Sequence, residues 1–350
     1  MTTQTQTTQT AGRLLTPGPD HATHVAVHGA LPGLTADTVE AAGLRGRGGA
    51  GFPTARKLRN PAAVVVANGC EGDPASAKDK VLLATAPHLV LDGLQLAAAM
   101  VGAREAVLCV HDARTVARAV AEHPFPVRVV QVPPRYVASE ETALVNFLAT
   151  GDARPTGKRP FEGRRKTLVD NVETLAQLAV LARVGPESFR RDESRLVTVD
   201  GQIWELPADV TIGEALRAAG RDPNAPALVG GFGGEWLAGA ELVRLSAVPG
   251  VAAIRTLRRG TCGLAETAAI LGYLAGESAR QCGPCTFGLP AIAADFADLT
   301  TSLPRLRARL GIIPGRGACA HPDGATRLAE SALRVFAADV AAHTKGRCLA

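Results

Sequence analysis

The first half of the chain alternates short apolar runs with longer stretches of helical spacing. Residues 62–68 (AAVVVAN), 106–111 (AVLCVH) and 126–133 (PVRVVQVP) are rich in Val and bounded by turn residues, so each predicts a buried strand. Helices are predicted between them, over about 87–101 and 113–123. Strands that alternate with helices are typical of a parallel α/β architecture.

Two further helices are predicted after the third strand. Residues 139–150 (SEETALVNFLAT) begin with Ser139, a good N-cap, followed by two acids in the first turn, where carboxylates favour the helix dipole. Asp170 and Glu173 have the spacing of a capping box, with Asp170 as the N-cap, and this helix is expected to continue to about Leu181.

The pattern changes near residue 195. Short β-type runs (LVTVDG, QIWELP), a small helix (TIGEALRAAG) and a glycine-rich turn (VGGFGGEW) predict a compact α+β module over about 195–250. From about Thr261 the apolar residues recur at helical spacing, which predicts a C-terminal helical bundle.

The first residues, MTTQTQTTQTAGRLL, are polar and low in complexity and lack the apolar core of a secretory signal. We therefore expect a disordered tail over residues 1–20 and a cytoplasmic protein, with peripheral attachment to a membrane through a partner left open. The most apolar stretch, residues 89–103, contains Asp92 and is shorter than the ~20 residues that a membrane-spanning helix needs. No direct membrane insertion is expected.

The composition adds few constraints. The 350 residues allow two or three domains at ~100–200 residues each. Aromatic residues make up 4% of the chain, so the core is expected to be aliphatic. The net charge of +5 is a mild excess, without the clustered basic stripes and interleaved aromatics of a nucleic-acid-binding protein. It fits a phosphate-bearing cofactor, and no nucleic-acid partner is expected.

Residues 43–58 (GLRGRGGAGFPTARKL) carry the clearest chemical signal. Five glycines lie within nine residues, with Arg45 and Arg47 between them. Glycine lets backbone N–H groups approach a ligand closely and form an anion-binding nest, and Arg adds charge-assisted hydrogen bonds. Lys57 is a further candidate phosphate contact. Taken alone, a flexible basic loop explains this stretch equally well.

Seven cysteines are unevenly distributed along the chain. Cys282 and Cys285 are close together, and Cys319 follows. In a cytosolic protein such cysteines indicate metal or redox chemistry rather than disulfides. The other four cysteines are scattered along the chain: Cys70, Cys109, Cys262 and Cys348. A buried apolar role suits Cys109 and Cys262.

The order of the motifs is diagnostic. The glycine loop is followed by a strand ending in Asn68, then by EGDP, KDK, PHL, SEETAL and DNVET, and finally by the cysteine-containing segment. This order resembles the NADH-binding 51 kDa (F) flavoprotein subunit of respiratory complex I and the related diaphorase subunits of NAD-dependent hydrogenases and formate dehydrogenases. The resemblance covers about residues 40–345, as in a short, divergent member.

The resemblance implies an α/β fold in three parts: a Rossmann-like FMN/NADH-binding domain, a β-grasp (soluble-ligand-binding, SLBB) module, and a C-terminal helical bundle for an iron–sulfur cluster. Combined with the segmentation above, the expected boundaries are a disordered tail over 1–20, the FMN/NADH-binding domain over 21–190, the β-grasp module over 191–255 and the helical iron–sulfur domain over 256–350.

The implied activity is hydride transfer from NADH or NADPH to FMN, followed by single-electron transfer through an iron–sulfur centre to a ferredoxin-like or membrane redox partner. The protein's task is to position the nicotinamide against the flavin and to tune it, so no general base is required. Several residues match family positions. For FMN they are Gly46, Arg47, Gly48, Gly49 and Lys57 at the phosphate, and Asn68, Asn171 and Thr174 at the flavin or its ribityl chain.

For NADH the matching residues are Phe52, Lys158 and Phe161, with Asp73 near the adenine or ribose and the acidic pair Glu140 and Glu141 near the reacting rings. For a 4Fe–4S cluster they are Cys282, Cys285 and Cys319.

The chain departs from the family at the cluster motif. The family has ESCGxCxPC, whereas residues 277–285 are ESARQCGPC, so Ala279 replaces the first ligand. Because a cubane cluster takes four thiolates, three possibilities stay open. The cluster is 3Fe–4S; or a fourth ligand comes from Ser278, His321, Cys348, water or a partner; or the cluster is absent.

Three smaller departures leave the affinity for NADH and the choice between NADH and NADPH open. Cys70 stands where the family has an Asp that helps bind FMN, Asp73 stands where it has a Glu, and Ser139 replaces a glycine. These departures also leave an alternative function open: a degenerate family member that serves as a partner-binding scaffold, with or without FMN.

Overall fold

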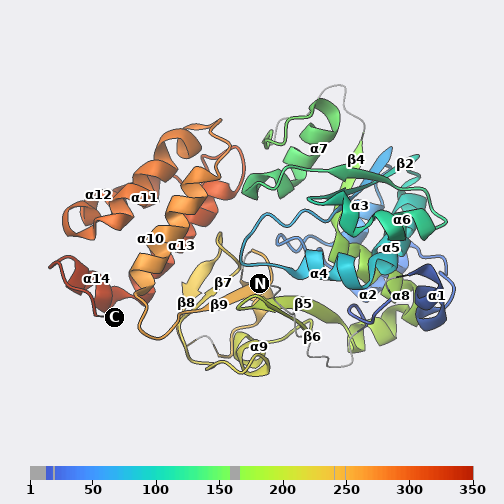
Figure 1. Ribbon diagram of the computed structural model, residues 1–350, viewed down its shortest axis with the longest axis horizontal. Helices are drawn as coiled ribbons and strands as arrows, with labels where there is room; N and C mark the ends of the chain where they lie inside the picture. Colours follow the sequence, from blue (N-terminus) through green and yellow to red (C-terminus); the bar gives the residue numbers. More distant parts are fainter. Residues whose placement is uncertain (1–12, 19, 158–165, 240, 249, 350) are drawn as a thin grey trace.

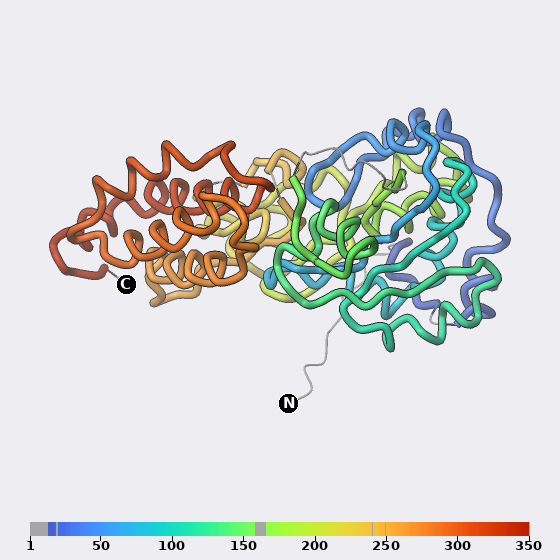
Figure 2. The backbone as a smooth tube through the Cα atoms, turned by 90° about the horizontal axis from the view of Figure 1, so that it is seen from above, coloured from blue at the N-terminus to red at the C-terminus, as the bar shows by residue number. Residues whose placement is uncertain are grey.

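The computed structural model describes residues 13–18, 20–157, 166–239, 241–248 and 250–349. The chain is elongated, with a four-stranded parallel sheet and its helices at one end, a five-stranded mixed sheet in the middle and a group of helices at the other end (Figures 1 and 2). This arrangement confirms the predicted α/β class and the helical C-terminal region.

The first sheet has the strand order β3-β2-β1-β4, with every neighbouring pair parallel. Its members are β1 (Val64–Asn68), β2 (Glu105–Val110), β3 (Arg128–Gln131) and β4 (Thr167–Asn171). The first three were predicted; β4 was not, because its Asp-Asn ending was interpreted as a helix start. The register places Asn68 beside Asn171. The chain continues from β1 to β2 on one side while β4 lies on the other, so the strand order reverses next to these two asparagines.

Helices cover both faces of this sheet. One face packs against α5 (Pro87–Val101) and α8 (Val172–Arg191), and the other against α7 (Glu141–Thr150). Helices α2 (Ala36–Ala42) and α4 (Lys78–Thr85) belong to the same core as α5 and α8 and pack against α8. Helix α5 has the predicted bounds and is buried along most of its length, as its nearly continuous apolar sequence requires. Gly93 allows α5 to approach α8, since a Cβ there would lie 1.8 Å from the carbonyl oxygen of Leu175. The shorter elements of this part are α1 (His21–His28), α3 (Thr54–Leu58), η1 (Ala113–Thr115), α6 (Ala117–Glu122) and η2 (Tyr136–Ser139).

Two predicted helix N-caps are wrong by one residue. Helix α7 is capped by Glu140, not Ser139; the Glu140 carboxylate accepts the N–H groups of Thr142 and Ala143 at 2.9 and 3.0 Å. Helix α8 is capped by Asn171 in place of Asp170, which lies inside β4. As a result, two candidate site residues, Glu140 and Asn171, begin helices.

Two expected helices also differ from their predicted extent. Helix α8 continues past Leu181 to Arg191, with a break at Gly185, whose φ of 75° is not helical. The stretch 113–123 divides into the short elements η1 and α6.

The second sheet has the order β6-β5-β9-β7-β8. Strands β5 and β9 are parallel, and the other neighbouring pairs are antiparallel. Helix α9 packs against the sheet through Ile212, Ala215 and Leu216. The elements are β5 (Ser194–Val199), β6 (Gln202–Pro207), α9 (Ile212–Ala218), β7 (Ala227–Val229), β8 (Glu235–Leu237), η3 (Leu245–Ala247) and β9 (Ala253–Thr256).

The C-terminal helices pack on β8 through Trp236, whose indole N–H donates to Thr267 at 2.9 Å and whose ring contacts Phe336. The predicted last helix divides at Phe336. Helix α12 was not predicted, since Pro304 and several arginines interrupt its apolar spacing. The elements are α10 (Gly263–Gly276), the π-helical turn η4 (Pro284–Gly288), α11 (Leu289–Ala297), α12 (Leu299–Ile312), α13 (His321–Val335) and α14 (Ala337–His343).

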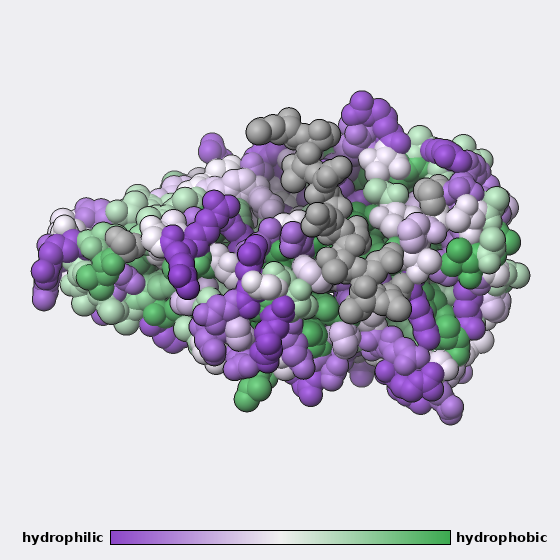
Figure 3. Space-filling view, turned by 60° about the horizontal axis from the view of Figure 1, so that its bottom comes forward, coloured by the Kyte–Doolittle hydropathy of each residue, from purple (hydrophilic) through white to green (hydrophobic). Residues whose placement is uncertain are grey.

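Among the described helices, none is long and apolar enough to cross a membrane by itself, although α4 and α5 meet the length and composition criteria together across a 98° bend. On the face drawn in Figure 3, hydrophilic and hydrophobic residues are interspersed over the coloured part of the surface.

Candidate functional site

A cavity of about 280 Å³ opens at the carboxyl ends of β1 and β4. This is the point where the strand order reverses, and ligands of open α/β sheets bind in the crevice there. All three parts of the chain contribute to its walls. Gly48 comes from the glycine loop, Asn68 and Asn171 from the strand ends, Gly233 from the loop between β7 and β8, and Cys319 from the segment before α13.

The glycine loop is held across the start of α8. The Arg47 N–H donates to the fully buried Thr174 hydroxyl at 2.8 Å. Gly49 has a φ of +100° and lies so close to Gly250 that a Cβ would be 3.2 Å from its carbonyl carbon and oxygen. Only glycine fits that position. Gly48 faces Asn171 and lines the cavity, whereas Gly46 bonds to Phe52 O at 2.8 Å and does not.

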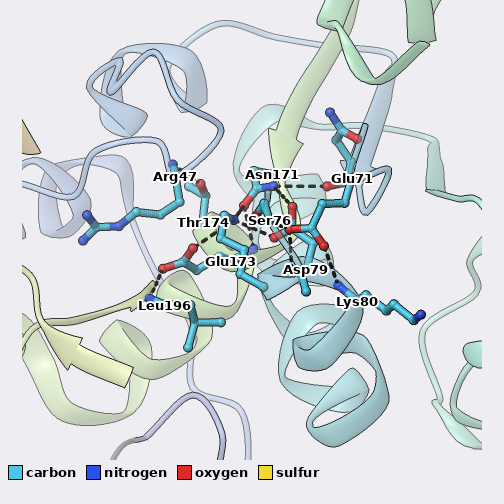
Figure 4. Close-up of polar contacts among 12 residues, drawn as sticks. Arg47, Glu71, Ser76, Asp79, Lys80, Asn171, Glu173, Thr174 and Leu196 are labelled. Carbon is cyan, nitrogen blue, oxygen red and sulfur yellow. Dashed lines mark hydrogen bonds and ion pairs between the residues drawn. The ribbon is translucent and has the colours of Figure 1, made fainter. Parts of the chain in front are cut away.

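Two arginines line the cavity with part of their hydrogen-bonding capacity unused. The Arg47 side chain runs away from Asn171 (Figure 4) and pairs with Glu193, and its Nε has no hydrogen-bond partner among the described residues. Arg327 of α13 donates to Gly233 O, and its Nε likewise lacks a partner within the part of the chain that the structure describes. Arg327 brings a positive charge to the cavity wall, which favours an anionic group there, whereas the Arg47 charge is already paired with Glu193.

A buried ion network forms one wall. Lys78 Nζ lies 2.6 Å from Asp79 Oδ1, 2.9 Å from Glu173 Oε2 and 3.0 Å from Asn171 Oδ1. Burial alone would lower the pKa of Lys78, but the surrounding carboxylates outweigh it and raise the pKa. Asn171 also donates to Asp79 Oδ2 at 2.7 Å, close to Glu71 (Figure 4). This network fixes the side chain of Asn171 at the cavity wall.

Asn68 is held equally firmly at the end of β1. Its Nδ2 donates to Ser139 O at 2.9 Å, and its Oδ1 accepts the Cys70 N–H at 3.1 Å. Cys70 lines the cavity, but burial raises the pKa of its thiol, so it stays protonated and weakly nucleophilic.

Asp73 joins the first sheet region to the second. Its carboxylate accepts the Ala75 and Phe232 N–H groups at 2.9 and 2.8 Å and the Tyr136 hydroxyl at 3.2 Å. Burial raises the pKa of Asp73, partly opposed by these hydrogen bonds, and burial together with Asp73 raises that of Tyr136. Both residues line the cavity.

The acidic pair divides. Glu140 lines the cavity while it caps α7, but Glu141 does not line it; the Glu141 side chain is 56% exposed and lies 3.5 Å from Lys57 Nζ. Lys57 donates to Val169 O at 2.7 Å and lies 3.5 Å from Asp170, whose pKa burial raises to about 6 against the opposing effect of Lys57. Thus the structure brings Glu140 to the cavity and leaves Lys57 and Glu141 outside it.

The three residues expected to hold NADH are less well defined. Phe52 is 46% exposed on the glycine loop and therefore free to stack against a ligand. Lys158 and Phe161 lie outside the described residues.

The three candidate cluster cysteines lie near one another. Cys285 is buried in the π-helical turn, a type of helix break common at functional sites. Burial, with the neighbouring Cys282 and Cys319 thiols, raises the pKa of Cys285 to about 12. Cys319 lines the cavity. Three thiols from two segments are a donor set that fits iron–sulfur ligation and leave one position to be filled.

The structure shows which of the possible fourth ligands lie near the three cysteines. Ser278 is buried, with its hydroxyl 3.5 Å from Cys285 O, and His321 lies two residues after Cys319 with Nε2 2.8 Å from Leu274 O. Cys348 is excluded, because it lies beside Cys262 at the opposite end of α10, a 14-residue helix of ~21 Å.

The sequence did not reveal the roles of Lys78, Tyr136 and Arg327 in this cavity. The KDK triplet around Lys78 was noted only as part of the motif order. Arg327 and Tyr136 carry no local signal, because they reach the site only through packing between distant segments.

Comparison with known families agrees with this geometry. Residues 39–180 match the Nuo51 FMN-binding domain, and residues 264–343 match the NADH-ubiquinone oxidoreductase-F iron-sulfur binding region. The chain therefore belongs to the family of 51 kDa (F) flavoprotein subunits.

Individual relatives have low sequence identity to this chain, but the aligned regions are long. The second F-type subunit of the NADH-quinone oxidoreductase of Rhizobium meliloti is 28% identical over 379 aligned residues, which cover 90% of this chain and 90% of that protein. The alpha subunit of the NAD-reducing hydrogenase HoxS of Cupriavidus necator is 29% identical over 58% of this chain and 41% of its own length. A crystal structure of an air-oxidised NAD⁺-reducing [NiFe]-hydrogenase superposes with a TM-score of 0.79 at 27% identity, covering 88% of this chain and 62% of that chain.

Proposed function

We propose that this chain is the NAD(P)H-oxidising flavoprotein subunit of a redox assembly. It takes a hydride from NADH or NADPH onto bound FMN and delivers electrons singly, through an iron–sulfur centre, to a ferredoxin-like or membrane redox partner. The observation that carries the proposal is the extent of one cavity. It reaches from the glycine loop and the ends of β1 and β4 to Cys319, so a flavin bound there would lie next to one of the three candidate cluster cysteines.

Three domains serve this function in the proposal: residues 21–190 for FMN and NADH, 191–255 as a β-grasp module, and 256–350 for the cluster. The order β6-β5-β9-β7-β8, with α9 between the two hairpins, supports the β-grasp assignment. The order β3-β2-β1-β4 supports a Rossmann-like first domain.

FMN, when bound, supplies the two-electron to one-electron conversion that nicotinamide cannot perform. The chain's own residues bind and orient it. Gly48 leaves room beside Asn171, and Arg327 brings to the cavity wall a positive charge that suits the phosphate, while Arg47 holds the loop through its pair with Glu193. Asn68 and Asn171 are pre-oriented by their hydrogen bonds, so little side-chain freedom is lost when a ligand binds.

Other candidate residues act more indirectly. Thr174 positions the loop through the Arg47 N–H, and Gly49 gives the loop its shape through its positive φ. Gly46 contributes only its backbone N–H to Phe52 O, which an alanine retains. In the proposal Glu140, which lines the cavity, faces the nicotinamide, and the exposed Phe52 stacks against the dinucleotide. The proposal gives supporting roles to Lys57, Asp73 and Glu141, because each already forms a hydrogen bond or an ion pair with a neighbouring protein group.

The test is purification without oxygen, followed by absorption spectra before and after NADH or NADPH. We expect one FMN per chain, bleaching of the flavin band by one of the two nucleotides, and iron with sulfide in an EPR-active centre. The matched variants are Gly48→Ala, which narrows the cavity beside Asn171, and Gly46→Ala, which lies outside it. Gly48→Ala should weaken FMN binding by at least ~10-fold, the effect of about 1.4 kcal/mol, and Gly46→Ala should not.

A chain that neither retains nor takes up FMN would overturn this function. The replacement of the first ligand by Ala279 favours a second candidate, a flavin-binding scaffold that does not relay electrons. Protein with FMN but without iron, sulfide or transfer to an acceptor would establish that alternative.

A further inference from the structure

A second set of metal-ligating side chains lies at the other end of the C-terminal helices, apart from the cavity. Cys262 precedes α10, His343 ends α14 and Cys348 follows in the last described segment. Their ligand atoms all lie within 4.8 Å of one another, and Cys262 Sγ is 3.4 Å from His343 Nε2. Because α10 separates them from Cys282, these residues do not belong to the iron–sulfur site.

We propose that Cys262, His343 and Cys348 bind a thiophilic divalent metal ion such as Zn²⁺. Two thiolates and one imidazole form a donor set that suits zinc, which takes four ligands in tetrahedral geometry. The set is not a local sequence motif, since Cys262 and His343 are 81 residues apart. Folding brings together the start of one helix and the end of another.

The surroundings are compatible with a fourth ligand. Asp339 lies one turn before His343 on the same face of α14, and it lines the same surface hollow as Cys262. A water molecule would complete the coordination, or the Asp339 carboxylate after a change of side-chain conformation, because that carboxylate lies outside the group whose ligand atoms are within 4.8 Å of one another. The cysteines are free thiols at the surface of the bundle, partly or well exposed to solvent, so an ion can reach them.

The position of the site indicates what the ion does. Helix α14 is only seven residues long, and the segment that follows it is exposed. A metal that binds Cys348 connects this segment to the start of α10, and an ion that binds only the folded chain stabilises it.

The test uses the full-length, untagged protein under reducing conditions, titrated with Zn²⁺ against a chromophoric chelator and, separately, with Co²⁺ for its thiolate charge-transfer absorption. Cys348→Ser is the main variant, because Cys348 is exposed and its replacement does not disturb the core. His343→Gln tests the imidazole. The matched control is Cys282→Ser, which removes one thiol from the other set.

We expect wild type and Cys282→Ser to share one class of Zn²⁺ site that Cys348→Ser and His343→Gln weaken by at least ~10-fold, the lower limit of what even outer-shell changes cost. The Co²⁺ thiolate bands of that class should fall in Cys348→Ser. Unchanged Zn²⁺ affinity in Cys348→Ser would overturn the proposal, and so would a Cys262–Cys348 disulfide that forms under reducing conditions and is not prevented by Zn²⁺. None of these results depends on flavin or iron content.

Discussion

The Lys78 ammonium lies 2.9 Å from the Glu173 carboxylate, with the two side chains 2% and 1% exposed. This ion pair joins α4 to α8 directly beneath the cavity. Removing one partner leaves an uncompensated buried charge, which typically costs about 3–5 kcal/mol. We therefore expect Lys78→Met to lower the free energy of unfolding by about that amount, measured by urea denaturation.

The control for this prediction is Lys80→Met, two residues further along the same helix at an exposed position. Its stability should stay within about 0.5 kcal/mol of wild type, as for most surface substitutions. Equal losses in the two variants would show that the Lys78–Glu173 pair is not responsible.

Glu140 has two separable roles, as the cap of α7 and as an acid in the cavity. Glu140→Ala loses both, and its free energy of unfolding should fall by about 1 kcal/mol through the lost cap. Glu140→Asp retains a capping carboxylate but withdraws it from the cavity. We expect Glu140→Asp to keep near-normal stability while the rate of flavin reduction by NADH falls, measured by stopped-flow absorption. A normal rate in Glu140→Asp would limit Glu140 to capping.

Much of this region could be predicted from residues close together in sequence. The spacing of apolar residues gave β1, β2, β3 and α5 because burial alone fixes those patterns. Each predicted N-cap precedes the observed one by one residue. Ser139 and Glu140 can both cap α7, and Asp170 and Asn171 can both cap α8, so tertiary packing decides between the two residues of each pair. Strand β4 could not be distinguished from a helix start for the same reason.

The site residues show the same contrast between local sequence signals and tertiary packing. The glycine loop and the two asparagines were found because each has a local signature that resembles the family. Arg327 was not, since it reaches the cavity only when α13 packs behind the loop between β7 and β8. Lys57 shows the converse: its place in the motif suggested a phosphate contact, but its ammonium reaches Val169 O and Asp170.

The buried Asp170 carboxyl predicts a loss of stability with rising pH. Burial raises its pKa from 3.8 to about 6, so between these values the folded chain retains a proton that the unfolded chain has lost. The free energy of unfolding therefore falls as pH rises from about 4 to 6 and stays lower above that range. Asp170→Asn removes this fall. The free energy of unfolding of Asp170→Asn minus that of wild type should be greater at pH 7 than at pH 4 by roughly 2 kcal/mol.

The check on this prediction is urea denaturation of both proteins at the two pH values. Asp209→Asn, whose side chain is 74% exposed, serves as the surface control and should show no such change. A constant difference between wild type and Asp170→Asn across the range would contradict the prediction.

A group of histidines predicts the opposite dependence in acid. His88 is fully buried, its ring nitrogens have no hydrogen-bond partner among the residues that the structure describes, and its ring lies 5.3–5.8 Å from those of His21, His24 and His123. Burial, then the neighbouring histidines, lower its pKa to about 4. The unfolded chain thus takes up a proton from about pH 6.5 downward that the folded chain does not, and stability falls between about pH 6.5 and 4.

We expect His88→Leu to reduce this acid sensitivity. Some sensitivity should persist, because burial and His24 lower the pKa of His28 to about 4 as well. Thermal denaturation of wild type and His88→Leu at several pH values between about 4 and 7 measures the effect. Parallel curves for the two proteins would exclude His88 as its source.

The last prediction concerns Ala279, which occupies the first ligand position of the family's cluster motif. Its backbone N–H faces the Cys285 sulfur, so a side chain at residue 279 starts close to the three-cysteine set. Ala279→Cys would supply the fourth thiolate that a cubane cluster takes. If the wild-type cluster is 3Fe–4S, the variant should bind more iron per chain than wild type and convert the 3Fe–4S EPR signal into that of a reduced 4Fe–4S centre.

Two further variants make the Ala279 result decisive. Ser278→Ala and His321→Gln test whether either neighbour already supplies the fourth ligand in wild type. If His321 does so, His321→Gln lowers the iron content and Ala279→Cys restores it in the double variant. If Ala279→Cys leaves the iron content and the EPR spectrum unchanged while Cys285→Ser abolishes both, the wild-type cluster already has a complete ligand set, and the alanine is not a deficit.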